Sequence, residues 1–313
     1  MRRKIYQELL QWKQRNGESA LLVQGARRVG KSYIVEAFAK AEYKSYILID
    51  FNLVDQQVKE MFEHDLVDLR TFFMKLTTYY GVKLYERESL IIFDEVQLFP
   101  RARSAIKYLV ADGRYDYIET GSLISIRENV KDILIPSEED HVDMYPLDFE
   151  EFLWANGNDT MMDFIRDCYR KKAPLGQALH RKAMDLFRQY LIVGGMPQAV
   201  NAFVKHNDFD EVDRVKRRIL NLYRDDIRKH AKGYEMKVEA IYDEIPSQMK
   251  NQNQHFKLSS LKQGARFDEY KDAMFWLSDA MIVNHCYNAT EPTFGLNLNR
   301  DRTLLKCYMG DTG

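Results

Sequence analysis

Cysteine is scarce in this sequence, with three residues, Cys168, Cys286 and Cys307, among 313. They lie far apart, their spacing matches no metal-binding pattern, and an odd number does not suit a framework of disulfide bonds. The composition therefore excludes a disulfide-rich secreted domain and a cysteine-based zinc site. We expect three reduced thiols in a reducing compartment.

Long apolar runs are also missing. No stretch approaches the roughly 20 apolar residues that span a bilayer. The N-terminal segment is basic but amphipathic, with Ile5, Leu9 and Trp12 on one helical face, and it lacks the apolar centre of a signal peptide. We therefore expect a cytoplasmic protein without a membrane partner.

Neither sign of charge is in excess, because 46 lysines and arginines face 47 aspartates and glutamates and the net charge is −1. This balance excludes a global basic field that would attract nucleic acid, although local basic patches remain open. Hydrophobic residues make up 45% of the chain and charged residues 30%, as in ordinary globular proteins, and the length suits about two domains. No internal repeat or low-complexity segment is visible.

The most informative feature is a glycine-framed loop at residues 25–32, Gly-Ala-Arg-Arg-Val-Gly-Lys-Ser. The preceding apolar segment ALLVQ is typical of a buried strand, and the following segment YIVEAFAKA has helical spacing. A strand, this loop and a helix, in that order, form the context of a phosphate-binding loop. The alternative is a chance match, which the correct flanking elements disfavour.

Each residue type in the loop suits the binding of nucleotide phosphates. Gly25 and Gly30 permit a tight turn whose amides, together with a helix N-terminus, offer partial positive charge to phosphate oxygens. Lys31 suits the β- and γ-phosphates, and the Ser32 hydroxyl suits Mg²⁺, so ATP and Mg²⁺ are the expected cofactors. The expected nucleotide-binding residues are Gly25, Ala26, Arg27, Arg28, Val29, Gly30, Lys31, Ser32 and Tyr33, with Arg27 or Arg28 facing solvent as the alternative for those two.

Two acids end the apolar segment SLIIFDE at residues 89–95. Ligands bind at the carboxyl ends of strands in open α/β sheets, so Asp94 is expected to hold Mg²⁺, through a water. Glu95 follows directly and is expected to act as the general base that orients the attacking water. The alternative is a solvated acidic pair that closes a strand; the phosphate-binding loop upstream favours the functional interpretation.

The pattern of elements divides the chain in two. Strands expected at residues 45–51, 89–95, 115–122 and 141–148 alternate with helices expected over 58–80 (one or two helices), over 103–111 and after 148. This alternation predicts a mostly parallel sheet covered on both faces. Beyond residue 158, long amphipathic helices such as 182–193 and 210–229 replace the strands, and the turn GGMP at 194–197 ends the first of them. We expect a domain boundary near residue 160.

The strand expected at residues 115–122 ends in polar residues. Thr120 and Ser122 stand where a side chain would sense the γ-phosphate or hold the attacking water; the alternative is ordinary turn chemistry of the Thr-Gly-Ser sequence. A further strand candidate lies between the phosphate-binding loop and the acid strand. That order is typical of the P-loop class with a catalytic glutamate.

Five segments together resemble a known family. GARRVGKS, SYILIDF, LIIFDEVQ, YIETGSLISI and MYPLDFEEFLW resemble, in this order, bacterial and archaeal AAA+-like ATPases that carry a C-terminal domain of unknown function. The resemblance covers nearly the whole chain and implies ATP binding and hydrolysis, with Mg²⁺. The implied fold is an α/β P-loop ATPase domain of the AAA+-like, catalytic-glutamate class, followed by an α-helical region with a winged-helix module. The family's motif positions fall on Gly25, Gly30, Lys31, Ser32, Asp94, Glu95 and the segment from Thr120 to Ser122.

An arginine from a neighbouring subunit or domain often completes such a site by neutralising charge in the transition state. Arg127, which follows the Thr-Gly-Ser turn, is the first candidate, and Arg101 and Arg103 are others. The alternative for each is an ordinary surface arginine. Supply from a neighbouring subunit would require an oligomer, which the sequence leaves open.

The C-terminal half is expected to contain a helical lid or linker over 161–235, a winged-helix-like module over 236–295 and the start of a further domain over 296–313. Members of the resembling family usually continue into a nuclease-like domain, but the motif of an acid followed by Glu-x-Lys does not occur after residue 296, so metal-dependent nuclease activity is not assigned to these residues. Lys257, Lys262, Arg266 and Lys271 are candidates for DNA phosphate contacts, although many acids lie among them. Three functions stay open: an ATPase that drives a conformational switch, a nucleotide-gated DNA-binding regulator, and an ATP-dependent module that binds an unknown protein partner.

Overall fold

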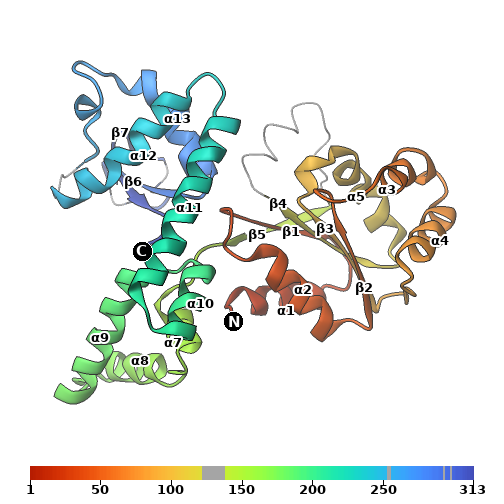
Figure 1. Ribbon diagram of the computed structural model, residues 1–313, viewed down its shortest axis with the longest axis horizontal. Helices are drawn as coiled ribbons and strands as arrows, with labels where there is room; N and C mark the ends of the chain where they lie inside the picture. Colours follow the sequence, from red (N-terminus) through yellow and green to blue (C-terminus); the bar gives the residue numbers. More distant parts are fainter. Residues whose placement is uncertain (122–137, 252–254, 292, 297) are drawn as a thin grey trace. The chain divides into compact units, whose positions relative to one another are not determined.

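The computed structural model describes residues 1–121, 138–251, 255–291, 293–296 and 298–313 (Figure 1). The chain forms two compact units, Met1–Met144 and Tyr145–Gly313. This division comes before the boundary expected near residue 160, because helix α7 (Phe149–Ala155) packs against three helices of the second unit. Those helices are α8 (Met161–Lys171), α9 (Gln177–Val193) and α10 (Pro197–His206).

A five-stranded parallel sheet forms the centre of the first unit, with the strand order β2-β3-β4-β1-β5. The strands are β1 (Ala20–Gly25), β2 (Ser45–Asp50), β3 (Ser89–Asp94), β4 (Asp116–Gly121) and β5 (Glu139–Met144). Every residue of β3 and β4 is buried, as expected for central strands of a sheet covered on both faces. The predicted α/β fold with a parallel sheet is therefore confirmed.

The register of the strands brings their carboxyl ends to one edge. Asp50 of β2 is paired with Asp94 of β3, and Gly25 of β1 is paired with Met144 of β5. Strand β5 ends four residues before the predicted strand end at residue 148. Pro146 has no N–H to donate, and the N–H of Leu147 donates to the carbonyl oxygen of Gly195, 2.7 Å away, so the sheet ladder stops.

Helices cover both faces of this sheet (Figure 1). Helices α1 (Ile5–Gln14) and α2 (Lys31–Glu42) lie on one face, and α3 (Gln56–Glu60), α4 (Leu69–Tyr80) and α5 (Pro100–Asp112) lie on the other. Between the sheet and this second group lies an aromatic core in which the rings of Phe51, Phe62, Phe72 and Phe93 meet largely edge to face.

The segment predicted as one or two helices over residues 58–80 forms three pieces. These are α3, a π-helical turn (Met61–Asp65) and α4. Asp55 and Asp68 each accept hydrogen bonds from two backbone amides and so begin α3 and α4 separately. The break between α3 and α4 follows from these two caps.

The second unit is mainly helical. Helix α11 (Phe209–His230) is followed by α12 (Glu235–Lys250), a 3₁₀ turn (Leu258–Ser260) and α13 (Phe267–Asp279). The chain then forms an antiparallel hairpin of β6 (Val283–Ala289) and β7 (Arg300–Met309). Helices α12 and α13 pack together and contact the hairpin (Figure 1). Strand β7 lies beyond residue 295, where the winged-helix-like module was expected to end, and the winged-helix assignment and DNA contact stay predictions. Throughout the described ranges, every helix is too short or too polar to cross a bilayer.

The turn at residues 194–197 is held from two sides within the second unit. Gly195 donates its N–H to a carboxylate oxygen of Asp311, 2.6 Å away, and its carbonyl oxygen accepts from Leu147. A Cβ at position 195 would lie 2.1 Å from the carbonyl oxygen of Leu147, so only glycine fits. The turn therefore joins the start of this unit to its last residues.

Two glutamates and an arginine are buried on the α5 side of the sheet. Glu119 of β4 and Glu139 of β5 flank strand β1, and Arg103 of α5 pairs with Glu139 at 2.8 Å. Burial, and then the neighbouring Glu139, raise the pKa of Glu119 well above its usual range. Within the described part of the chain, neither oxygen of Glu119 receives a hydrogen bond. A proton retained by Glu119 would leave the Glu139 carboxylate as the single negative charge beside Arg103.

Replacing Glu119 with glutamine should raise the free energy of unfolding by about 1–3 kcal/mol at a pH of about 7–8. The unfolded chain releases the Glu119 proton above its ordinary pKa of 4.5, whereas the folded chain retains it, so wild-type stability falls as the pH rises through this window. Glutamine keeps a neutral donor and removes that slope. Denaturant unfolding of the full chain across pH provides the measurement.

Glu119→Ala is the matched control, since it removes the donor, leaves a cavity and should be less stable than wild type. A glutamine variant whose stability keeps the wild-type pH slope would contradict a protonated Glu119.

Candidate active site

The phosphate-binding loop occupies the turn between β1 and α2, at the carboxyl edge of the sheet. A Cβ at position 25 would lie 2.2 Å from the carbonyl oxygen of Met144, so this close approach of β1 and β5 requires glycine. Gly30 is the N-cap of α2 and has a φ of 97°, in the left-handed region that favours glycine. Both glycines therefore have a physical reason at their positions.

Lys31 begins α2 and its side chain is folded back over the loop. Its Nζ donates to the carbonyl oxygens of Gly25 and Ala26, at 2.9 and 3.0 Å. Burial lowers the pKa of Lys31, and the nearby Glu95 and Asp94 carboxylates act in the opposite direction by favouring the charged form. The ammonium group is thus held at the centre of the loop by weak neutral acceptors, which phosphate oxygens can replace with stronger charged ones.

Asp94 connects three elements at the sheet edge. Its Oδ1 accepts a hydrogen bond from the Ser32 hydroxyl of α2 at 2.7 Å and another from the Thr120 hydroxyl of β4. The carboxylate is buried, with 8% of the residue exposed. Strand β4 lies between β3 and β1 in the sheet, and this order brings Thr120 to Asp94.

Glu95 follows Asp94 in a left-handed conformation, with a φ of 55°. This backbone is unusual for glutamate and turns the side chain away from the direction that a continued strand would give. Its carboxylate accepts a hydrogen bond from the buried Gln97 amide, and its own N–H donates to the Thr120 hydroxyl at 3.4 Å. Glu95 is half-buried, so the carboxylate is oriented but reachable by water.

These groups fit a magnesium–nucleotide complex. A hydroxyl and a carboxylate oxygen 2.7 Å apart are the hard oxygen ligands that Mg²⁺ takes from proteins when phosphates and waters supply the others. The cationic Lys31 and the N-terminus of α2 offer the positive charge that phosphates need. The arrangement can hold a phosphate chain and a metal ion next to one oriented carboxylate.

The other predicted site residues divide into three groups. Arg27 and Arg28 are exposed at the loop surface, and Tyr33 is 61% exposed on the first turn of α2. Ser122 and Arg127 lie outside the described residues. Arg101 donates to the carbonyl oxygen of Phe62 at 3.4 Å, whereas Arg103 is 2% exposed and paired with Glu139. Arg103 is therefore structural, and we do not propose it as the completing arginine.

Sequence reasoning missed two side chains that contact the predicted site residues. Gln97 donates to Glu95, and Arg3 donates to the carbonyl oxygen of Val29 in the phosphate-binding loop. Gln97 stands two residues after Glu95, so its position beside the predicted base was a usable signal. Arg3 lies 26 residues before Val29, and no local pattern marks this contact.

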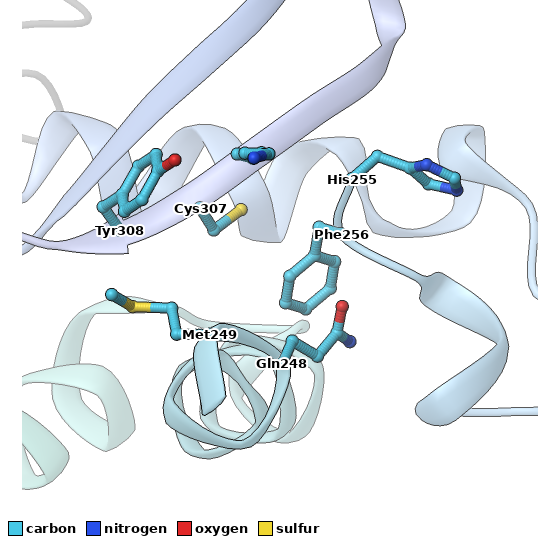
Figure 2. Close-up of a pocket in the computed structure, with 7 residues that line it drawn as sticks. Gln248, Met249, His255, Phe256, Cys307 and Tyr308 are labelled. Carbon is cyan, nitrogen blue, oxygen red and sulfur yellow. The ribbon is translucent and has the colours of Figure 1, made fainter. Parts of the chain in front are cut away.

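A separate cavity of about 230 Å³ lies in the second unit, between the end of α12 and strand β7 (Figure 2). It is lined by Gln248, Met249, His255, Phe256, Lys306, Cys307 and Tyr308. Gln248 uses its amide to hold the backbone of Lys257 and the Ser260 hydroxyl. Burial raises the pKa of the Cys307 thiol to about 12, which keeps it protonated and unreactive. Gln248 and Cys307 are therefore structural in character.

Two family models match the sequence. Residues 17–153 match a model described as an AAA domain, and residues 184–313 match a domain of unknown function (DUF8612). The first match spans the phosphate-binding loop, both acids and Thr120. The resemblance to AAA-type ATPases with a C-terminal domain of unknown function is thereby confirmed. No curated protein matches the sequence significantly.

Solved structures with a similar fold include a Walker-type ATPase of Pyrococcus abyssi. It is 14% identical, with a TM-score of 0.53 over 99% of this chain and 93% of that chain. The Aeropyrum pernix ORC1 protein, solved in complex with DNA, is 10% identical with a TM-score of 0.34, over 99% of this chain and 90% of that one. The Thermotoga maritima RuvB Holliday junction branch migration motor is 10% identical with a TM-score of 0.34, over 91% and 89%. At these identities the first likeness shows the fold alone, and the two low TM-scores carry no argument.

Proposed function

We propose that this chain, a P-loop ATPase through its N-terminal AAA domain, binds ATP with Mg²⁺, hydrolyses it to ADP and phosphate, and changes conformation as it does so. The observation that carries the proposal is the cluster of Ser32, Asp94 and Thr120, joined by hydrogen bonds through Asp94 Oδ1, next to Lys31 and Glu95.

Each residue has a role that follows from its chemistry. Lys31 binds the β- and γ-phosphates, and the loop amides and the N-terminus of α2 bind the remaining phosphate oxygens. Glu95 accepts a proton from water as the water oxygen bonds to the γ-phosphorus and the bond to ADP breaks. Thr120 fixes Asp94 and the Glu95 amide, and so orients the base. Ser32 and Asp94 would hold Mg²⁺, which supplies charge neutralisation on the phosphates.

The conformational part of the proposal rests on the contact between Gly25 and β5. Gly25 fits directly against the carbonyl oxygen of Met144, the last residue of the first unit. A nucleotide that moves the loop therefore acts on the strand from which the chain enters the second unit. Hydrogen exchange at residues 144–148, with and without ATP, measures this effect; identical exchange in both states would leave an ATPase without the proposed switch.

Mg²⁺ should increase the ATP affinity of wild type, and Asp94→Asn should lose most of this increase. The ATP affinity of the variant in Mg²⁺ should therefore be lower than that of wild type by about tenfold or more. In EDTA the variant should bind ATP about as well as wild type, because the lost carboxylate would have held the metal, through a water, and not the phosphates. Titration of a fluorescent ATP analogue in Mg²⁺ and in EDTA measures both values, and phosphate release tests hydrolysis.

Asp50→Asn is the matched control, because Asp50 ends the neighbouring strand β2 in register with Asp94. It should keep the wild-type response to Mg²⁺. An Asp94→Asn variant whose ATP affinity still rises with Mg²⁺ as in wild type would remove Asp94 from the metal site.

A further inference from the structure

Arg3 reaches from the N-terminal segment into the phosphate-binding loop. It precedes α1, yet only 7% of the residue is exposed, and its Nη1 donates to the carbonyl oxygen of Val29 at 3.0 Å. A buried arginine is uncommon and is normally retained by the bonds that its guanidinium makes. One of its partners is a backbone group in the middle of the loop.

The backbone around Val29 is unusual on both sides. Arg28 has a φ of 71° and Gly30 a φ of 97°, so two left-handed residues flank Val29. The Val29 side chain is fully buried and fits against Gly25. A backbone with two such residues is strained, at least at Arg28, and the surrounding structure must hold it in place. The contact from Arg3 is one of the bonds that does so.

This contact also determines where an amide points. The peptide bond between Val29 and Gly30 is trans, so its C=O and N–H point in opposite directions. Because Arg3 holds the carbonyl oxygen of Val29 on one side, the N–H of Gly30 is directed to the other. Gly30 caps the N-terminus of α2, where amides bind anions.

We propose that Arg3 is a positioning residue for nucleotide binding, which fixes the Val29–Gly30 peptide so that the Gly30 amide faces the phosphates. This inference rests on the proposed ATP-binding function. Phosphates of the bound nucleotide contact this amide before and during hydrolysis, so the effect belongs to binding and not to the chemical step. Loss of Arg3 should therefore raise KM and leave kcat nearly unchanged.

The test compares three variants of the full chain with wild type and with Lys31→Met, in which ADP binding should be lost. Arg3→Met fills similar space without a donor and should weaken ADP binding about tenfold, the size of one charge-assisted hydrogen bond. Arg3→Lys keeps a charged donor of similar reach and should stay within about threefold of wild type. Arg15→Met is the control, because Arg15 ends α1 with an exposed ion pair to Asp140 at 2.7 Å and should change nothing. Titration calorimetry with ADP and steady-state ATPase kinetics provide Kd, KM and kcat.

The outcomes separate this inference from the proposed function. If wild type binds ADP, Lys31→Met does not, and Arg3→Met binds as wild type does, the positioning role is overturned. A fall in kcat with an unchanged KM in Arg3→Met would also overturn the positioning role. If Arg3→Met fails to fold, Arg3→Gln, a shorter and neutral polar variant, replaces it, with the same loss of ADP affinity expected and wild-type affinity overturning the inference. Absence of ADP binding in wild type itself would refute the proposed function instead.

Discussion

Replacing Glu95 with glutamine is expected to slow ATP hydrolysis by about 10²- to 10⁴-fold, while ATP affinity stays within about threefold of wild type. Glutamine has nearly the same shape and still reaches the Gln97 amide, but it cannot accept the proton that the attacking water loses. The left-handed backbone at Glu95 and the bond from its amide to Thr120 are unaffected by the change. Single-turnover hydrolysis of radiolabelled ATP, with a parallel binding titration, separates the two quantities.

Glu88→Gln is the matched control for this prediction. Glu88 precedes the same strand at its other end, where it pairs with Lys44 at 3.2 Å on the surface. Its substitution should leave turnover unchanged. If Glu95→Gln turns over ATP as fast as Glu88→Gln, Glu95 is not the general base.

Lys31→Met should lower the affinity for ATP and ADP by about 100-fold or more, without destabilising the nucleotide-free protein. The two effects differ because Lys31 has different partners in the two states. With nucleotide, its charge meets phosphate oxygens. Without nucleotide, the buried ammonium has carbonyl oxygens at 2.9 and 3.0 Å and a pKa that burial lowers. Methionine removes a buried charge from the nucleotide-free protein. The free energy of unfolding of Lys31→Met without nucleotide should therefore be equal to or above that of wild type.

The pH dependence of stability provides a second measurement for Lys31. Its pKa is lowered in the folded chain and is near 10.5 when the chain unfolds. Between these two values the unfolded state binds more protons, so wild-type stability without nucleotide rises with pH in that window. Lys31→Met should lose this rise.

Lys40→Met is the control on the same helix, because Lys40 is exposed and pairs with Glu36 at 2.7 Å. It should keep wild-type nucleotide affinity and pH dependence. A Lys31→Met variant that binds ADP like Lys40→Met would contradict the proposed role of Lys31.

Much of the site could be predicted because its signals are local. The loop at residues 25–32 carries its own glycines, and the flanking strand and helix show their periodicity within a few residues. Strand β3 is a continuous apolar run that ends in Asp94, so the position of the acid at the sheet edge followed from the parallel sheet alone. The sequence left one or two helices open over residues 58–80, and the capping of α3 and α4 by Asp55 and Asp68 separates them.

By itself, the sequence determined that the chain has a phosphate-binding loop, an acid strand and a parallel sheet, since backbone preference and hydrophobic period are properties of neighbouring residues. Only the tertiary structure decided which distant groups meet. The strand order placed Thr120 on Asp94 and Glu119 near Glu139, and the packing of the N-terminal segment placed Arg3 on Val29. These contacts depend on strand order, register and side-chain packing across the sheet, which no local pattern specifies.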